Sequence, residues 1–227
     1  NMSHEMRTPL HQAIAMAQLM RREAMSEKQT IRLDRLETSC RRMNGLVDSV
    51  LELTQLEEGM TTLQEQPFVV DHLLGEVASL VEEHASQKNL PITVEASSSP
   101  IGVQGDVRLI KMALFNYVSN AVRFTEQGRV ILRASVLEET DLAALVRFEV
   151  LDTGIGIAPE DMDRLFSTFE QVDNSATRKF GGLGVGLSIS KKIAVRLGGD
   201  VGCDSNVGQG STFWLSVSLR RLVNHAG

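Results

Sequence analysis

Apolar residues recur with a helical period in the first quarter of the chain, where the only proline is Pro9. From residue 33 the apolar positions step alternately by three and four residues, which is a heptad seam: Leu33, Leu36, Cys40, Met43, Val47, Val50 and Thr54. Further leucines widen this seam into the broader apolar face of a bundle helix: Leu46, Leu53 and Leu56. Residues 1–24 have a second stripe, formed by Met6, Leu10, Ala13, Ala17 and Met20. The pattern predicts a helical hairpin over residues 1–60, with its turn at the polar residues 25–28.

A hairpin of two helices cannot enclose a core by itself. We therefore expect a homodimer in which two copies of residues 1–60 form a four-helix bundle. The alternative is a hairpin that packs on the remainder of its own chain.

After Gly59 the pattern changes to mixed helix and strand, and residues 61–227 form the second predicted domain. β-branched and alternating runs predict strands near 67–70, 91–96, 128–137, 145–152, 199–204 and 211–219. Helices are expected near 71–88, 106–125, 160–165 and 186–198, with Asp71 and Asp106 at N-cap positions. Residues 153–186 are rich in glycine and polar residues without periodicity, which favours a functional lid.

Composition narrows the function classes. Hydrophobic residues make up 42% and charged residues 23%, as in soluble globular proteins. The net charge of −6 gives no basic surface for nucleic acid. No apolar run is long enough to span a bilayer, so we expect this fragment of a longer protein not to contact the membrane. Two distant cysteines, Cys40 and Cys203, favour reduced and buried thiols in a cytosolic protein.

Ser3-His4-Glu5-Met6-Arg7-Thr8-Pro9-Leu10 places a histidine beside a carboxylate on the first helix. A carboxylate that holds the Nδ1 proton leaves the His4 Nε2 atom free to attack. A solvated polar pair is the alternative. Pro9 removes a helical hydrogen bond and introduces a bend.

Two amides lie on one face of the helix predicted at 106–125. Asn116 and Asn120 are four residues apart, so both side chains lie on the same side. Amide oxygens together with phosphate oxygens and water suit Mg²⁺, which keeps several waters. An exposed polar helix face is the alternative.

Two segments are rich in glycine, and the first of them follows an apolar strand. Asp152-Thr153-Gly154-Ile155-Gly156 places a carboxylate at a strand end, where it can accept from an exocyclic amine such as that of adenine. Glycines at 181–186 precede the helix at 186–198 and offer N–H groups to phosphates. Arg178 and Lys179 stand just upstream, either near a γ-phosphate or as solvated loop charges. The segment matches neither the Rossmann fingerprint nor the P-loop.

The order and spacing of these segments resemble those of the histidine protein kinases of two-component systems. SHEMRTPL is similar to their H box, residues 106–125 to the N box, and DTGIGI to the first glycine box. LFSTFEQ is similar to the F box, GGLGVGLS to the second glycine box, and GQGSTF to the closing signature. The resemblance covers the whole chain and is strongest to the hybrid subclass, which carries receiver domains.

This resemblance implies an all-α hairpin followed by an α+β, Bergerat-type ATP-binding sandwich with a mixed sheet. It implies ATP and Mg²⁺ as ligands and a response-regulator receiver domain as partner. His4 would be the phosphoacceptor, Glu5 its base or orienting carboxylate, and Thr8 the residue that orients water in a phosphatase reaction. Asn120 would be the main metal ligand, helped by Asn116. Nucleotide contacts would come from Asn116, Asn120, Arg123, Phe124, Asp152, Gly154, Gly156, Phe166, Phe169, Arg178, Lys179, Gly182, Gly184, Gly186, Leu187 and Thr212.

Three residues depart from the family pattern. Arg123 replaces the usual lysine, Leu183 a usual threonine and Val185 a usual leucine. Besides an active kinase, these departures leave open a scaffold that binds another kinase through its hairpin. A third interpretation, an ATPase similar to those of DNA gyrase, MutL and the large heat-shock chaperones, is disfavoured. Those enzymes use a carboxylate near the first asparagine of the N box to activate water, whereas here Phe115 precedes Asn116. We expect the chain to be the cytoplasmic portion of a membrane-anchored sensor.

Overall fold

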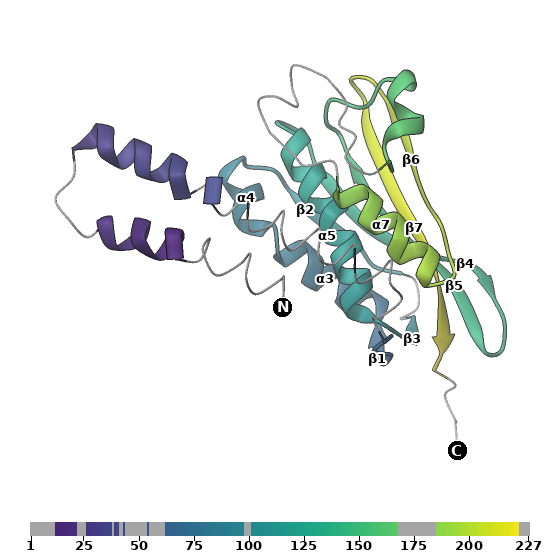
Figure 1. Cartoon of the computed structure of the whole chain (residues 1–227). Coiled ribbons are helices and arrows are strands. Elements are labelled where there is room, and N and C mark those ends of the chain that lie inside the picture. Colours follow the sequence, from purple (N-terminus) through teal and green to yellow (C-terminus); the bar gives the residue numbers. More distant parts are fainter. Residues whose placement is uncertain are drawn as a thin grey trace. The chain divides into compact units, whose positions relative to one another are not determined.

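The chain divides into two compact units, residues 1–61 and 62–227. The computed structural model describes residues 12–21, 26–37, 39–40, 43, 54, 62–97, 101–167 and 185–222 (Figure 1). Within these ranges no helix is long and apolar enough to cross a membrane.

In the first unit, residues 12–20 and 27–37 are helical. The second of these segments begins inside the predicted turn at 25–28, because Ser26 caps it: the backbone N and the hydroxyl of Ser26 both donate to Gln29 Oε1, at 2.9 and 2.7 Å. Arg21 joins the two segments through Asp34 at 2.5 Å and Glu37 at 3.0 Å. The two helical segments are thus held together by ion pairs near the predicted turn.

In the second unit the described strands form a seven-stranded sheet in the order β1-β3-β7-β5-β4-β2, with β6 pairing to β7. β2 and β4 pair in parallel and the other pairs are antiparallel. The strands are β1 (Gln66–Val69), β2 (Ile92–Glu95), β3 (Gly102–Gly105), β4 (Val130–Glu139), β5 (Ala143–Asp152), β6 (Val201–Asn206) and β7 (Gly210–Arg221). The mixed sheet confirms the predicted fold class.

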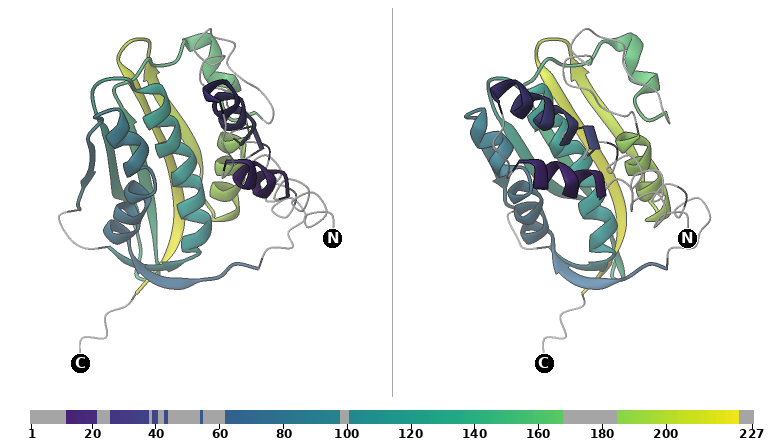
Figure 2. Two further views of the ribbon diagram at one scale, coloured as in Figure 1. Left: turned by 90° about the vertical axis from the view of Figure 1, so that its left-hand side faces the viewer. Right: turned by 60° about the vertical axis from the view of Figure 1, so that its left-hand side comes forward.

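Helices cover one face of this sheet, as Figure 2 shows. They are α3 (Val70–Ser79), α4 (Glu82–Gln87), α5 (Val107–Phe124) and α7 (Gly186–Arg196). A 3₁₀ helix, η1 (Pro159–Arg164), lies between β5 and α7 in the sequence. The alternate residues of β5 that face the helices are buried: Ala144, Val146, Phe148 and Val150. The core therefore lies between the helices and one face of the sheet, and none of the described helices of this unit lies on the other face.

The structure corrects four predicted features of this unit. The helix predicted at 71–88 is two helices, because Leu80 and Val81 bond to carbonyls three residues back, which ends α3 in a tight turn. Asp71 is not an N-cap: Val69 holds that position, and the Asp71 carboxylate accepts from Ser97 instead. The helix predicted at 160–165 is the 3₁₀ helix η1. β3 is a strand that was not predicted.

Helix α5 is held at both ends. At its start the Asp106 carboxylate accepts from the backbone N of Leu109 at 3.1 Å and of Gln64 at 3.0 Å, which confirms the predicted cap. At its end Lys88 Nζ donates to the carbonyls of Val122 at 2.9 Å, Arg123 at 3.1 Å and Thr125 at 3.2 Å. A cation is favourable there because the helix dipole leaves negative partial charge on the last carbonyls.

We predict that Lys88→Met lowers the free energy of unfolding of the second unit by about 2 kcal/mol, because charge-assisted hydrogen bonds to three carbonyls are lost. Trp214, the single tryptophan, lies in β7 and reports this unfolding by its fluorescence in a urea titration. Lys191→Met, on the exposed surface of α7, removes the same charge and serves as the control. Equal stability of the two variants would contradict the role given to Lys88.

Candidate functional site

Asp152 is the last residue of β5 and lies on the helix-covered side of the sheet by strand alternation. Its Oδ1 atom accepts a hydrogen bond from the backbone N of Gly154 at 2.8 Å. Burial raises the pKa of the Asp152 carboxyl, while backbone hydrogen bonds from Gly154 and Ser211 oppose that rise. Asp152 therefore offers a partly buried acceptor that is still open for a donor.

The loop after β5 leaves no space for a side chain at Gly154. A Cβ atom there would lie 2.5 Å from the Phe124 carbonyl oxygen, 2.8 Å from Asp152 Oδ1 and 2.9 Å from Thr125 Oγ1. Gly156 has a φ of +69°, and its Cβ atom would lie 2.0 Å from the carbonyl oxygen of Asn206. Both predicted glycines thus let the loop pack closely, on the end of α5 and on the β6–β7 turn respectively.

The start of β7 lies beside Asp152 in the sheet, where Ser211 is its register partner. Ser211 is buried, and its hydroxyl is 2.9 Å from that of Ser205. Phe213 and Leu215, two and four residues further on, are buried like Ser211, so Ser211 shares the helix-covered side with Asp152. Thr212 faces the opposite side, because successive strand residues alternate. Thr212 nevertheless lines the same cavity as Asp152, and strand alternation selects Ser211 as the β7 residue on the helix-covered side.

The two amides of α5 have different surroundings. Asn116 Nδ2 donates to the Gly186 carbonyl oxygen at 2.9 Å and to Ser190 Oγ at 3.3 Å, which fixes the first turn of α7 against α5. Asn120, one turn further on, is half-buried and has no side-chain hydrogen bond within the described ranges. The Asn120 amide oxygen is therefore available as a ligand, whereas the Asn116 amide nitrogen is already used in the fold.

Aromatic rings pack beside these amides. The rings of Tyr117 and Phe213 are 5.5 Å apart, and that of Phe166 meets Phe213 edge-on at 6.5 Å. Tyr117 is fully buried, and its hydroxyl donates to the Trp214 carbonyl oxygen at 3.4 Å. Burial raises the pKa of the Tyr117 hydroxyl. These rings link α5, β7 and the end of η1 on the helix-covered side.

The remaining predicted site residues divide into two groups. The Arg123 guanidinium lies 5.8 Å from the centre of the Phe124 ring at the end of α5, and Leu187 is partly exposed on α7. Eight residues lie outside the described ranges: His4, Glu5, Thr8, Phe169, Arg178, Lys179, Gly182 and Gly184.

The two cysteines, Cys40 and Cys203, are only half-buried, whereas the sequence predicted buried thiols. Burial raises the pKa of the Cys203 thiol to about 12.

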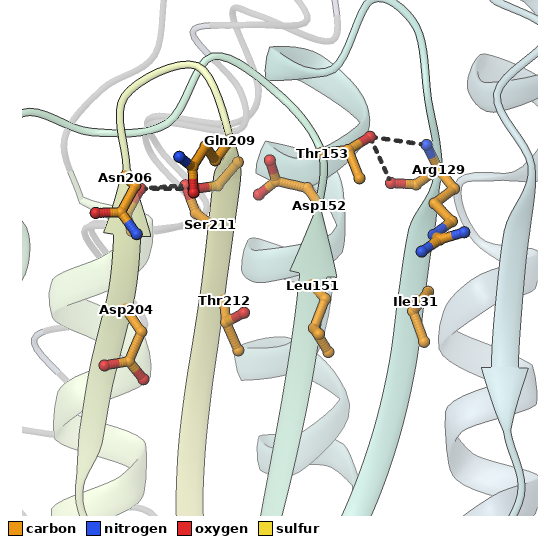
Figure 3. Close-up of a pocket in the computed structure, with 12 residues that line it drawn as sticks. Arg129, Ile131, Leu151, Asp152, Thr153, Asp204, Asn206, Gln209, Ser211 and Thr212 are labelled. Carbon is orange, nitrogen blue, oxygen red and sulfur yellow. Dashed lines mark hydrogen bonds between the residues drawn. The ribbon is translucent and has the colours of Figure 1, made fainter.

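A cavity of about 330 Å³ lies on the side of the sheet away from the helices (Figure 3). The residues that line it include Ile131, Leu151, Thr212, Arg129 and Asp204. Asp152 also lines this cavity, so the end of β5 lies between the cavity and the helix-covered side of the sheet. No described group of three or more His, Cys, Asp or Glu side chains could hold a metal ion here or elsewhere.

The carboxylate at the strand end can accept from a donor such as an amine, the glycine loop lets a flat group approach the backbone, and the Asn120 amide oxygen is available to a cation. Mg²⁺ accepts neutral amide oxygens when phosphates supply the remaining ligands, so Asn120 fits that ion. The fold and the site together define a nucleotide-binding α/β sandwich.

Comparisons with known proteins agree with this class. The family model for histidine kinase-, DNA gyrase B-, and HSP90-like ATPases matches residues 105–221, and that for the His Kinase A (phospho-acceptor) domain matches residues 1–59. Sensor histidine kinase GacS of Pseudomonas protegens is 36% identical over 100% of this chain and 25% of its own length. Signal transduction histidine-protein kinase BarA of Escherichia coli K12 is 34% identical over 96% of this chain and 24% of its own length.

Solved structures give the same result. Full-length ShkA in complex with AMPPNP has a TM-score of 0.81 and 33% identity, covering 97% of this chain and 45% of that one. The catalytic domain of histidine kinase ThkA has a TM-score of 0.56 and 27% identity, covering 68% of this chain and 97% of that one. The chain belongs to the histidine kinase-, DNA gyrase B- and HSP90-like ATPase family, and within it to the sensor histidine kinases. It spans about a quarter of the length of the curated relatives named above.

We predict that Asp152→Asn makes the second unit more stable at neutral pH. Since the folded-state pKa of Asp152 is raised, the folded chain binds this proton more readily than the unfolded chain, and the charged carboxylate costs stability. This cost is lost as the pH falls through the raised pKa towards the ordinary value of 3.8. Urea unfolding followed by Trp214 fluorescence at neutral and acidic pH measures the difference.

Asp163→Asn, at an exposed position of η1, is the control for the loss of one negative charge. An Asp152→Asn gain that matched this control, or that grew as the pH fell, would contradict the assignment.

Proposed function

We propose that this chain is the kinase core of a two-component sensor, which uses ATP to phosphorylate His4 and then passes the phosphoryl group to a receiver-domain aspartate. The observation that carries the proposal is the junction of Asp152, Gly154 and the end of α5. This junction suits an adenine, and it stands in a chain that also matches a phospho-acceptor domain.

The adenine would bind on the helix-covered side at the end of β5. Its exocyclic amine would donate to the Asp152 carboxylate, and Gly154 lets the base approach the backbone closely. Ser211, beside Asp152, replaces Thr212 as the β7 residue of this pocket. Phe166 and Phe213 would supply apolar contact area near the base. This arrangement gives the base an oriented place, and orientation is a large part of catalysis in phosphoryl transfer.

Mg²⁺ would be held by the Asn120 amide oxygen, with the amide oxygen of Asn116 as a second contact, and it supplies charge neutralisation on the phosphate oxygens. Asn116 also ties α5 to the first turn of α7 through Gly186 and Ser190. The glycine segment at 181–186 leads into that same turn, so Asn116 would hold the phosphate-facing end of the lid at a fixed distance from Asn120.

In the chemical step, the His4 Nε2 atom would attack the γ-phosphorus as the bond from that phosphorus to the ADP oxygen breaks. Glu5 would hold the Nδ1 proton and stabilise the positive charge on the ring. ADP leaves, and the phosphoryl group then moves from nitrogen to an aspartate oxygen of the receiver, which regenerates neutral His4. Thr8, four residues after His4, would orient water for the phosphatase role, in which the phosphoaspartate of the receiver is hydrolysed.

The hairpin would act as a homodimer. Its described helical residues expose large apolar side chains on segments that have little core of their own: Met16 (62%), Leu19 (55%), Met20 (53%), Ile31 (48%), Leu36 (49%) and Met43 (53%). A second hairpin would cover this surface and complete a four-helix bundle.

We predict that incubation with γ-labelled ATP and Mg²⁺ labels the chain in an acid-labile, alkali-stable form, as expected for phosphohistidine. His4→Ala should abolish the label, and Asn120→Ala should reduce it by at least about 100-fold, because the metal loses its main protein ligand. His84→Ala, an exposed histidine of α4, is the matched control and should keep full labelling.

Absence of label from a chain that also fails to bind ADP would exclude the kinase and favour a binding scaffold. Label that persists in His4→Ala would place the phosphoacceptor elsewhere.

A further inference from the structure

Helices α5 and α7 lie side by side on the sheet (Figure 2), and the first turn of α7 is tied to the middle of α5. α7 begins at Gly186, and the N-cap residue Val185 makes no side-chain hydrogen bond to it. Its first turn is held by α5 instead, because the Gly186 carbonyl oxygen accepts from Asn116 Nδ2 at 2.9 Å. The position of this turn and that of the Asn116 amide therefore depend on each other.

The Asn116 amide has one orientation in this arrangement. Its NH₂ group carries two donors, and both are used: one goes to the Gly186 carbonyl oxygen and the other to Ser190 Oγ at 3.3 Å. A carbonyl oxygen can only accept, so a flipped amide would place Oδ1 against the Gly186 oxygen. The nitrogen end of the amide is thus fixed, and Oδ1 accepts no hydrogen bond within the described ranges.

The Ser190 hydroxyl is itself fixed. Its side chain is fully buried, and Oγ lies 3.0 Å from the Gly186 carbonyl oxygen and 3.3 Å from the carbonyl oxygen of Ala113 in α5. Since both of these oxygens are acceptors, the hydroxyl proton points at them and a lone pair of Oγ is left for Asn116 Nδ2. Ser190 therefore acts as an acceptor for the amide.

Gly186 leaves the amide oxygen uncovered. A Cβ atom at this position would lie 3.1 Å from Asn116 Oδ1 and 3.2 Å from its Cγ, closer than carbon atoms normally pack. The backbone of Gly186 is helical and its φ is not positive, so alanine could adopt it. The glycine is therefore explained by the neighbouring amide and not by the backbone.

We propose that Gly186 and Ser190 are positioning residues of the metal site, which hold the Asn116 amide so that its oxygen stays open to Mg²⁺. This inference rests on the proposed function, in which Asn116 is the second metal contact beside Asn120. Groups that orient a metal ligand through hydrogen bonds are worth about 10- to 100-fold in metal affinity. Because Gly186 is the first residue of α7, the metal binds well only when the first turn of that helix is formed.

Helix α3 contains a matched control pair. Ser79 Oγ donates to the Gly75 carbonyl oxygen four residues earlier at 3.0 Å, as Ser190 does to Gly186. Ser79 is exposed, and a Cβ atom at Gly75 would meet no atom of another element within 4 Å. Gly75→Ala and Ser79→Ala thus repeat the two chemical changes without a neighbouring amide.

The test measures the ADP affinity of the full chain by calorimetric titration, once with saturating Mg²⁺ and once in EDTA. We expect Gly186→Ala and Ser190→Ala each to weaken ADP binding about tenfold with Mg²⁺ and to leave it unchanged in EDTA. Gly75→Ala and Ser79→Ala should match the parent in both conditions. One change adds a methyl group and the other removes a hydroxyl, so they disturb packing in opposite directions. A shared loss of the Mg²⁺ effect therefore points to Asn116.

Urea unfolding followed by Trp214 fluorescence shows whether each variant is folded, and if one is not, the other decides. Unchanged ADP affinity with Mg²⁺ in a folded variant would overturn the proposal. Equal weakening with Mg²⁺ and in EDTA would also overturn it, because that result assigns the two residues to packing. A parent chain that binds ADP equally well in both conditions would remove the metal site and this inference, while nucleotide binding would stand. Failure of the parent chain to bind ADP at all would overturn the proposed function itself.

Discussion

The second unit depends on the fixed position of helix α5. Asp106 accepts hydrogen bonds at its first turn, and Lys88 donates to the carbonyls of its last turn. Between these two anchors lie Asn116, which bonds to α7, and Asn120. At the end of α5 lie the Phe124 carbonyl and the Thr125 side chain on which the glycine loop packs. A helix free to slide by one residue would separate all of these groups from Asp152.

Close packing of backbone, rather than a large cavity, builds the site. At Gly154 the loop after β5 meets the end of α5, and at Gly156 it meets the β6–β7 turn, in both places at distances that exclude a side chain. The antiparallel register between β5 and β7 brings Ser211 beside Asp152. The result is a small set of oxygen atoms held by three elements, which in the proposed function would position a planar base.

Elements with strong local patterns were predictable, and residues that depend on tertiary contacts were not. β4, β5, β7 and α5 show clear periodicity, whereas β3 reads Gly-Val-Gln-Gly and exists because β1 and β7 pair with it. The sequence motifs identified Asp152 and Gly154 as site residues. They did not show that Ser211, and not Thr212, lies on the same side of the sheet as Asp152, which depends on the alternation of residues along β7. Lys88 gave no signal, because its hydrogen bonds go to carbonyls more than 30 residues further along the sequence. Asp71 was predicted to be a helix N-cap, but its carboxylate instead accepts a hydrogen bond from the Ser97 hydroxyl.

The most direct test of the central claim, that the base binds where α5 meets the end of β5, is hydrogen–deuterium exchange of the full chain with and without ADP and Mg²⁺. Slower exchange on addition of nucleotide is expected in two segments, residues 121–126 and 152–157. Slower exchange confined to β6 and the start of β4, which line the cavity on the other side of the sheet, would contradict the account.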